Sequence, residues 1–312
     1  MRKNITVEFT NERIIPSGGL AVVGAILGKS DFVKNCNNMK VDCNHPQHQI
    51  KNGDVMLTYI GMQCMGKPSF DAVHEMDDDP DFYKAALGIC YAIPSAETLR
   101  QRFDLIGSSI RRQVLDENIK MLKSNGVVPS KLPCGYVPVD MDVSPFDNSK
   151  TCKEGVSRTY KGCDGYAPMF AYIGSEGYLA SLELREGKQH CQKGTPQFLE
   201  ETIGLCRQLT DEPLLFRLDS GNDSAENIGI LLERGCHFII KRNLRKESKE
   251  DWLRMAKDNS LDITHPRDGK DVYIGSDWKE ITYQAQDGTT KHATLRMGYE
   301  IIERTIDKKG QF

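Results

Sequence analysis

The sequence predicts a mixed α/β protein, and three observations support this fold class. After an irregular arm at 1–30 and a polar, loop-like stretch at 31–50, apolar residues recur at helical spacing from Gly53 to about Lys123. From Val137 to Ser144 they alternate with polar residues, as in a strand with one buried face. Between 168 and 241, strand patterns are joined first by turns and then by helices. Strands that are connected in both ways form a mixed sheet.

The front of the chain is predicted to be mainly helical. Ser95 is a good N-cap for one of these helices, because its hydroxyl can accept a backbone N–H of the first turn. Asn125 and Gly126 end the last of them. Helical patterns occupy a segment from 53, residues 81–87, a segment from 94, and residues 110–123.

The remaining chain is predicted to hold a sheet and then hairpins. Pro213–Leu218 is a nearly continuous apolar run, which is typical of a strand buried on both faces. The other strands of the sheet are predicted at 137–144, 168–173, 178–184 and 236–241, with helices near 195–209 and after 223. A charged segment at 244–260 precedes alternating stretches at 271–274, 280–286 and 294–306, which predict hairpin strands.

Composition narrows the function classes. The 41 Lys and Arg residues against 44 Asp and Glu give a net charge of −3, which argues against a uniformly basic nucleic-acid coat. The sequence has no apolar run of about 18 residues and no apolar stretch at its start, so we expect a cytoplasmic protein that neither spans a membrane nor is exported. Glycine-rich phosphate loops and a Gly-x-Ser-x-Gly elbow are also absent from it.

The cysteines do not predict a disulfide scaffold. Ten cysteines in 312 residues are too few for one, so we expect reduced thiols. One cluster has zinc-type ligands, but its irregular spacing favours a polar loop over a metal site; it consists of Cys36, Cys43, His45 and His48. Neighbouring His190 and Cys191 are predicted to be structural or surface residues rather than a catalytic pair.

Two aspartates at strand ends carry the strongest chemical hypothesis. Asp142 lies on the first strand of the predicted sheet, and Asp219 ends the fourth. If these strands are neighbours, the two carboxylates meet at one edge, where a divalent cation between them would offset their repulsion. Oxygen ligands favour Mg²⁺ or Mn²⁺, and such a site suits phosphodiester chemistry. Spacing alone leaves the alternative open that each is a turn former or a helix cap.

Several motifs together resemble a known class of enzymes. They are Asp140-Met141-Asp142-Val143-Ser144-Pro145, Lys153-Glu154-Gly155, Tyr160-Lys161-Gly162, Gly165-Tyr166-Ala167-Pro168 and Arg217-Leu218-Asp219-Ser220-Gly221. This combination resembles bacterial insertion-sequence transposases of the DDE class, and most closely the insertion-sequence family thirteen-eighty. The resemblance covers most of the chain, including Asp77–Pro80 and Pro94–Phe103.

The resemblance implies a ribonuclease-H-like core with a β-rich insertion, and a helical front that binds the terminal inverted repeats of the element. On this basis we expect a helical DNA-binding region at 1–130, the first part of the catalytic core at 131–243, and the β-rich insertion at 244–312. Asp142 and Asp219 match the first and second catalytic carboxylates, which hold two Mg²⁺ or Mn²⁺ ions. The partners would be double-stranded terminal-repeat and target DNA, with a homodimer as the active complex.

The sequence departs from the family pattern at the third carboxylate, a Glu on a helix after the insertion. The last glutamates, Glu280, Glu300 and Glu303, lie in strand-like stretches. We therefore expect a chain truncated before the catalytic Glu, with little or no activity alone. Two other functions remain open: a non-catalytic remnant that competes for the terminal repeats, and a metal-dependent nuclease on the same fold.

Other polar, aromatic and basic residues are predicted to have roles outside metal binding. Asp140 is interpreted as a supporting or solvated group rather than a direct ligand. Asp223 is interpreted as the N-cap of the next helix, with Ser224 as the alternative cap. Trp252 and Trp278 are predicted to be buried rather than to stack on bases. Two locally basic stretches predict phosphate contacts, through Arg100, Arg102, Lys241, Arg242, Arg245 and Lys246.

Overall fold

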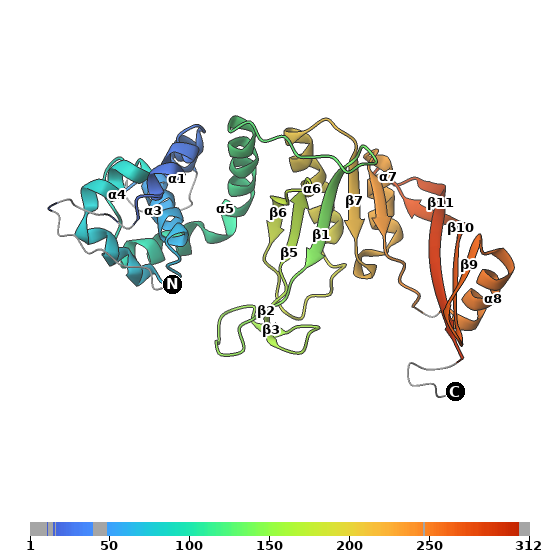
Figure 1. The fold of residues 1–312 in the computed structure, drawn as a ribbon. Helices are drawn as coiled ribbons and strands as arrows, with labels where there is room; N and C mark the ends of the chain where they lie inside the picture. Colours follow the sequence, from blue (N-terminus) through green and yellow to red (C-terminus); the bar gives the residue numbers. More distant parts are fainter. Residues whose placement is uncertain (1–10, 12–14, 16, 40–48, 246, 306–312) are drawn as a thin grey trace, which may run out of the picture. The chain divides into compact units, whose positions relative to one another are not determined.

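The computed structural model describes residues 11, 15, 17–39, 49–245 and 247–305 (Figure 1). The chain divides into two compact units, residues 1–128 and 129–312. Each has a hydrophobic core of its own. No helix within the described residues is both long enough and apolar enough to cross a membrane.

The first unit is helical, as predicted from residue 53 onward, but it also has helices at Leu20–Leu27 and Phe32–Asn37, where an irregular arm and a polar loop are predicted. Its elements are α1 (Leu20–Leu27), α2 (Phe32–Asn37), α3 (Asn52–Cys64), the 3-10 helix η1 (Phe70–Asp78), α4 (Pro80–Leu87) and α5 (Ala96–Ser124). Ser95 caps α5 by accepting the N–H of Thr98 at 3.2 Å, so this predicted cap is confirmed. The two helices predicted between 94 and 123 are one helix, which runs through Gly107 without a break.

Buried polar side chains tie the first unit together. The Asp54 carboxylate, 2% exposed, accepts the N–H groups of Cys90 at 2.9 Å and Tyr91 at 3.0 Å. Arg102, 6% exposed, donates to the Ile50 carbonyl at 3.2 Å. These bonds hold the start of α3 and the approach to α5 in place.

The structure bears only in part on the zinc-type cluster. Cys36 is buried in the core of the first unit, and burial raises the pKa of its thiol to about 11. A thiol held in its protonated form is a poor metal ligand. The other three members of the cluster, Cys43, His45 and His48, lie outside the described residues.

Two glycines of the first unit should respond oppositely to alanine. A Cβ on Gly24 of α1 would lie 1.9 Å from the Ala86 carbonyl oxygen of α4, whereas a Cβ on Gly107 of α5 would meet open space. We expect Gly24→Ala to destabilise the protein by about 2 kcal/mol or more, and Gly107→Ala to stabilise it by about 0.5–1 kcal/mol through helix propensity. Urea denaturation of the two variants checks this; equal midpoints would contradict the close contact between α1 and α4.

The second unit is built on a five-stranded mixed sheet, which confirms the predicted fold class. Its strand order is β6-β5-β1-β7-β8. β1 pairs antiparallel with β5 and parallel with β7, and β8 runs parallel to β7. The strands are β1 (Val137–Val143), β5 (Met169–Ile173), β6 (Tyr178–Glu183), β7 (Leu214–Leu218) and β8 (His237–Ile240).

Two helices cover one face of this sheet (Figure 1). They are α6 (Thr195–Leu209) and α7 (Ala225–Glu233), and they bury the odd-numbered apolar residues of β1 and the even-numbered ones of β7. Val139 and Phe216 are fully buried in this core, as is Leu199 of α6. The alternation in the sequence therefore sends Asp140 and Asp142 to the opposite face.

A small sheet between β1 and β5 was not predicted. It consists of β2 (Phe146–Asp147), β4 (Asp164–Tyr166) and β3 (Ser157–Arg158), in that order. Figure 1 shows it beyond the ends of β1 and β5. Gly165 permits its closest approach, since a Cβ there would lie 1.8 Å from the Phe146 carbonyl oxygen.

The last part of the chain holds a helix and a three-stranded antiparallel sheet. Its elements are α8 (Lys249–Asn259), β9 (Asp262–Arg267), β10 (Lys270–Gln284) and β11 (Thr290–Arg304). The strands predicted at 271–274 and 280–286 are one continuous strand to Gln284, and β9 was missed. Lys291 pairs with Glu233 of α7 at 2.5 Å, which links the hairpin to the core.

Candidate active site

Asp142 and Asp219 lie at the same edge of the mixed sheet. β1 and β7 are neighbouring parallel strands whose register ends at the pair Met141 and Leu218. Each aspartate follows its member of that pair by one residue, and both side chains are exposed. The strand order therefore meets the condition under which the two carboxylates come together.

The bonding of the two aspartates leaves oxygens available to a ligand. Asp142 Oδ1 accepts the N–H of Val143 at 2.8 Å, and Asp219 Oδ1 accepts the side-chain amide of Asn222 at 2.6 Å. Across the described residues, neither carboxylate has a basic partner. Two uncompensated carboxylates side by side are a donor set that fits Mg²⁺ or Mn²⁺.

Asp140 is engaged elsewhere. It is the register partner of Arg217 on β7, and the two form a bidentate ion pair in which Arg217 Nε lies 2.5 Å from Asp140 Oδ1. The hydrogen bond to Asp140 raises the pKa of Arg217. This pair lies one row deeper than Asp142 and Asp219 on the same face, so its geometry fits a supporting group rather than a ligand.

No third carboxylate joins the pair within the described ranges, where no group of three or more acidic, His or Cys residues is placed to hold a metal. Glu280 is on β10 and Glu300 is on β11, which confirms that these residues lie in strands. Glu303, also on β11, accepts the Tyr273 hydroxyl at 3.1 Å. A helical Glu of the kind the resemblance requires is therefore not supplied by these three.

Two further side chains border the carboxylate pair and were not predicted as site residues. The Tyr160 hydroxyl donates to the Val143 carbonyl at 3.4 Å, on the Asp142 side. The Cys191 thiol donates to the Gly221 carbonyl at 3.2 Å, on the Asp219 side. Tyr160 belongs to a motif of the resemblance, whereas Cys191, in the loop before α6, is predicted from the sequence to be a structural or surface residue.

The carboxylates influence the pKa values of both groups. Although most of Tyr160 is exposed, desolvation of the phenol and then the charges of Asp142 and Asp219 raise its pKa. Burial, followed by the Asp219 charge, raises the pKa of the Cys191 thiol. Both groups are therefore neutral near pH 7.

The reactivity of Cys191 offers a test of its contact with Asp219. Asp219→Asn removes a negative charge that disfavours the thiolate, so we expect iodoacetamide to alkylate Cys191 several-fold faster near pH 8. In the protein that retains Asp219, the rate at which Cys191 is alkylated should rise only at a pH above the ordinary pKa of a thiol. Peptide mass spectrometry measures the rate, with exposed Cys64 as the internal control. An unchanged rate at Cys191 would contradict the contact.

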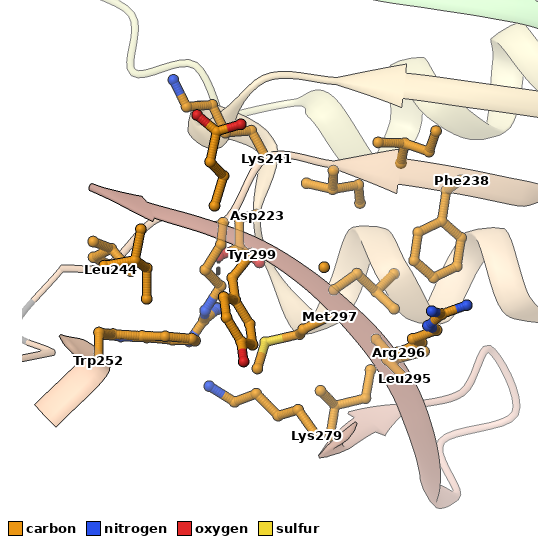
Figure 2. Close-up of a pocket in the computed structure, with 18 of the residues that line it drawn as sticks. Asp223, Phe238, Lys241, Leu244, Trp252, Lys279, Leu295, Arg296, Met297 and Tyr299 are labelled. Carbon is orange, nitrogen blue, oxygen red and sulfur yellow. Dashed lines mark hydrogen bonds and ion pairs between the residues drawn. The ribbon is translucent and has the colours of Figure 1, made fainter. Parts of the chain in front are cut away.

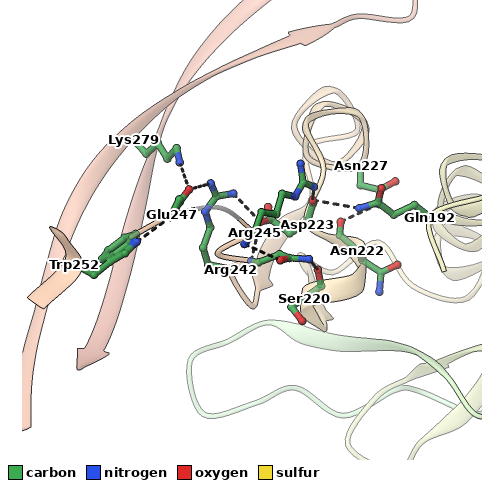
Figure 3. Close-up of polar contacts among 11 residues, drawn as sticks. Gln192, Ser220, Asn222, Asp223, Asn227, Arg242, Arg245, Glu247, Trp252 and Lys279 are labelled. Carbon is green, nitrogen blue, oxygen red and sulfur yellow. Dashed lines mark hydrogen bonds and ion pairs between the residues drawn. The ribbon is translucent and has the colours of Figure 1, made fainter. Parts of the chain in front are cut away.

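Of the two N-cap candidates for α7, Asp223 has a different role. Ser224 caps α7 by accepting the N–H of Asn227 at 3.2 Å. Asp223 is 6% exposed, and its Oδ2 accepts Arg242 Nη1 at 2.7 Å and the N–H of Asn243 at 2.9 Å (Figure 3). It anchors the segment after β8, a tertiary contact that the local sequence does not reveal.

Arg242 and Arg245 belong to this network. Arg242 also contacts Glu247, which accepts Trp252 Nε1 at 3.0 Å and Lys279 Nζ at 3.3 Å (Figure 3). Arg245 donates to the Asp223 carbonyl at 2.7 Å. The network joins the core to α8 and β10, so these two arginines hold the fold together at this point.

The other predicted phosphate contacts are placed in several ways. Lys241 is exposed and lies one residue beyond β8, level with Asp219 across the sheet. Its backbone N–H donates to the Leu218 carbonyl at 3.1 Å. Arg100 is partly exposed and pairs with Asp71 at 2.6 Å. The burial of Arg102 is a correction, because an interior guanidinium bonded to the chain is not presented to DNA. Lys246 lies outside the described residues.

A cavity of about 920 Å³ lies between the core and the hairpin (Figure 2). Phe238, Trp252, Met297 and Tyr299 line it, and Lys241 stands at its border. Trp252 is half-buried here, whereas Trp278 on β10 is 65% exposed, so the prediction that Trp278 is buried is wrong.

Comparisons with known proteins identify the family. Residues 1–294 match the family described as transposase DDE domain group 1. No curated protein matches the chain. Among solved structures it is similar to piggyBac transposase in a synaptic complex with hairpin DNA, at 11% identity and a TM-score of 0.34, covering 89% of this chain and 59% of that one. Since the family match spans nearly the whole chain, the protein belongs to the DDE transposase family.

Proposed function

We propose that this protein is a DNA transposase that cleaves and joins DNA strands with divalent metal ions held by Asp142 and Asp219. The observation that carries the proposal is the pairing of β1 with β7, which sets two exposed, uncompensated carboxylates at one sheet edge. Membership of the DDE family, whose members generally use divalent metal ions, supports the same reaction class.

The residues of the edge have distinct parts in this proposal. Asp142 and Asp219 hold Mg²⁺ or Mn²⁺, which when bound stabilises the attacking and leaving oxygens of a phosphodiester. The ion pair between Asp140 and Arg217 links β1 to β7 next to these carboxylates and helps to hold the strand ends in position. Lys241, unpaired in the described part of the chain and beside Asp219, is placed to contact a phosphate of the bound strand. Water attacks first and frees a 3′-hydroxyl, which then attacks target DNA.

The organisation of the chain in this proposal follows the resemblance to insertion-sequence family thirteen-eighty. The helical region at 1–130 binds terminal inverted repeats, with Arg100 among the phosphate contacts. Residues 131–243 form the ribonuclease-H-like core, and 244–312 form a β-rich insertion. The protein acts as a homodimer on double-stranded DNA in the bacterial cytoplasm, associated with the nucleoid.

A second function is favoured by one observation, the lack of a third carboxylate beside the pair in the described residues. Two oxygen ligands constrain metals less than three do. The chain would then occupy terminal repeats without cleaving them and compete with an active transposase.

One experiment distinguishes the two functions. The protein is incubated with duplex DNA that carries the inverted repeats flanking its gene, in MgCl₂ or in EDTA. Strand cleavage at the repeat ends and joined products, both dependent on MgCl₂, are expected of a transposase. Specific binding without cleavage would support the competing remnant instead. Cleavage without any need for the repeats, and without joining, would indicate a metal-dependent nuclease and overturn the proposal.

A further inference from the structure

The turn Thr159–Gly162 presents two exposed side chains beside the carboxylate pair. The Gly162 N–H donates to the Thr159 carbonyl at 3.0 Å, and Gly162 has φ +83°, a conformation that favours glycine. Tyr160 and Lys161 occupy the centre of the turn, and both are exposed. This turn therefore shows a phenol and an ammonium group to the solvent.

The turn is held firmly. Thr159 is 4% exposed, and both its N–H and its hydroxyl donate to the Cys163 carbonyl at 2.9 Å. The small sheet behind it is fixed to the chain before α6, because the Lys188 N–H donates to the Ser157 hydroxyl at 3.0 Å. The backbone of this turn therefore loses little freedom when its side chains bind a ligand.

Its position places the turn at the Asp142–Asp219 edge. The Tyr160 hydroxyl lies 3.4 Å from the carbonyl of Val143, the residue after Asp142. Lys161 Nζ lies 6.0 Å from the centre of the Tyr160 ring. Within the described part of the chain, Lys161 has no acidic partner.

The chemistry of these groups fits one ligand. Tyr160 is 71% exposed, so its ring is not held by core packing. A phenol hydroxyl that makes only a long hydrogen bond can donate to a stronger acceptor. An unpaired ammonium group that binds a DNA phosphate releases the counterions condensed on that phosphate. Both groups are hydrogen-bond donors, and Lys161 is also a cation. A ligand that matches them is therefore anionic and lies along the carboxylate edge.

We propose that the Thr159–Gly162 turn contacts the DNA strand at the carboxylate edge, with Tyr160 donating to one phosphate oxygen and Lys161 neutralising a neighbouring phosphate. This inference rests on the proposed function and adds to it, because it assigns positioning of the strand to the small sheet between β1 and β5. Neither residue is required to hold metal.

The test measures DNA binding by the full chain without cleavage. Fluorescence anisotropy follows the binding of a labelled duplex of random sequence in CaCl₂ over a series of KCl concentrations. The variants are Lys161→Ala and Tyr160→Phe. Their matched controls are Lys150→Ala, an exposed lysine in the loop between β2 and β3, and Tyr172→Phe on β5. Circular dichroism verifies that each variant is folded.

We expect Lys161→Ala to weaken binding roughly three- to tenfold at low salt and to lower the slope of log K against log salt by about one. Tyr160→Phe should weaken binding by a factor of roughly 2–10 at an unchanged slope, since a neutral hydroxyl releases no counterion. Both control variants should bind like the original chain.

Three results would overturn the inference. The first is a slope of log K against log salt that is the same for Lys161→Ala as for the original chain. The second is an equal decrease of this slope in Lys150→Ala. The third is an unchanged affinity of Tyr160→Phe for DNA. If the original chain itself binds no duplex, DNA binding fails as a whole, and the proposed function fails with it. Loss of Mg²⁺-dependent cleavage in Asp142→Asn, with wild-type binding by Lys161→Ala and Tyr160→Phe, would reject this inference while leaving the proposed function intact.

Discussion

Replacing Asp219 with asparagine is expected to lower Mg²⁺-dependent strand cleavage by at least about a hundredfold, since even groups that only support a ligand change metal affinity or activity by roughly 10–100-fold. The amide keeps the size of the side chain and its contact with Asn222 but removes the charge that holds the cation. Affinity for Mn²⁺, measured by electron paramagnetic resonance, should fall in parallel. That second readout applies whether or not the chain cleaves DNA.

Asp211→Asn is the matched control for this substitution. Asp211 is an exposed carboxylate before the start of β7, whereas Asp219 follows the end of the same strand. The net charge changes equally in the two variants, so a general electrostatic effect on DNA binding would appear in both. Equal Mn²⁺ affinity in Asp219→Asn, Asp211→Asn and the original chain would contradict the assignment of Asp219 to metal.

Asp223→Ala is expected to destabilise the second unit by about 3 kcal/mol, because it leaves a partly buried arginine without one of its two carboxylates. Asp223 is 6% exposed, and its loss also removes the acceptor for the Asn243 N–H at 2.9 Å. The segment between β8 and α8 should loosen with it. Urea denaturation gives the change in the free energy of unfolding.

An exposed ion pair provides the comparison for Asp223. Asp251 pairs with Arg254 on α8 at 3.1 Å, with both side chains about 70% exposed. Because solvent screens such a pair, Asp251→Ala should change stability by less than about 1 kcal/mol. If Asp223→Ala cost no more than Asp251→Ala, the network in Figure 3 would not be a structural anchor.

The two aspartates could be found from sequence because strand patterns fix strand ends. Period-two alternation at 137–144 and the apolar run at 213–218 locate where β1 and β7 stop, and Asp142 and Asp219 lie there. What the patterns do not contain is the strand order. Long-range pairing of β1 with β7 is a tertiary property, so the meeting of the two carboxylates stayed conditional until the register was known.

The remaining parts of the site depend on contacts that have no local signature. The strands of the small sheet are two or three residues long, too short for a periodic pattern, so the surroundings of Tyr160 were not predicted. Asp223 precedes a helix as a cap does, but its partners, Arg242 and Asn243, lie 19 and 20 residues away.

Exposure is equally hard to predict from residue type. A tryptophan is usually well buried, yet Trp278 lies on an exposed position of β10, where alternation along a long strand sends every second side chain to solvent. Arg102 shows the converse, because a basic residue in an amphipathic helix is ordinarily solvated, and here it is bonded in the interior.

The central claim is that Asp142 and Asp219 together hold a divalent cation. A crystal of the protein soaked in MnCl₂, with diffraction measured near the manganese absorption edge, tests it most directly. We expect an anomalous peak at the carboxyl edge of β1 and β7, within about 2.0–2.6 Å of oxygens from both side chains, and its loss in Asp142→Asn. A peak bound by neither carboxylate, or no peak at this edge at saturating MnCl₂, would contradict the account.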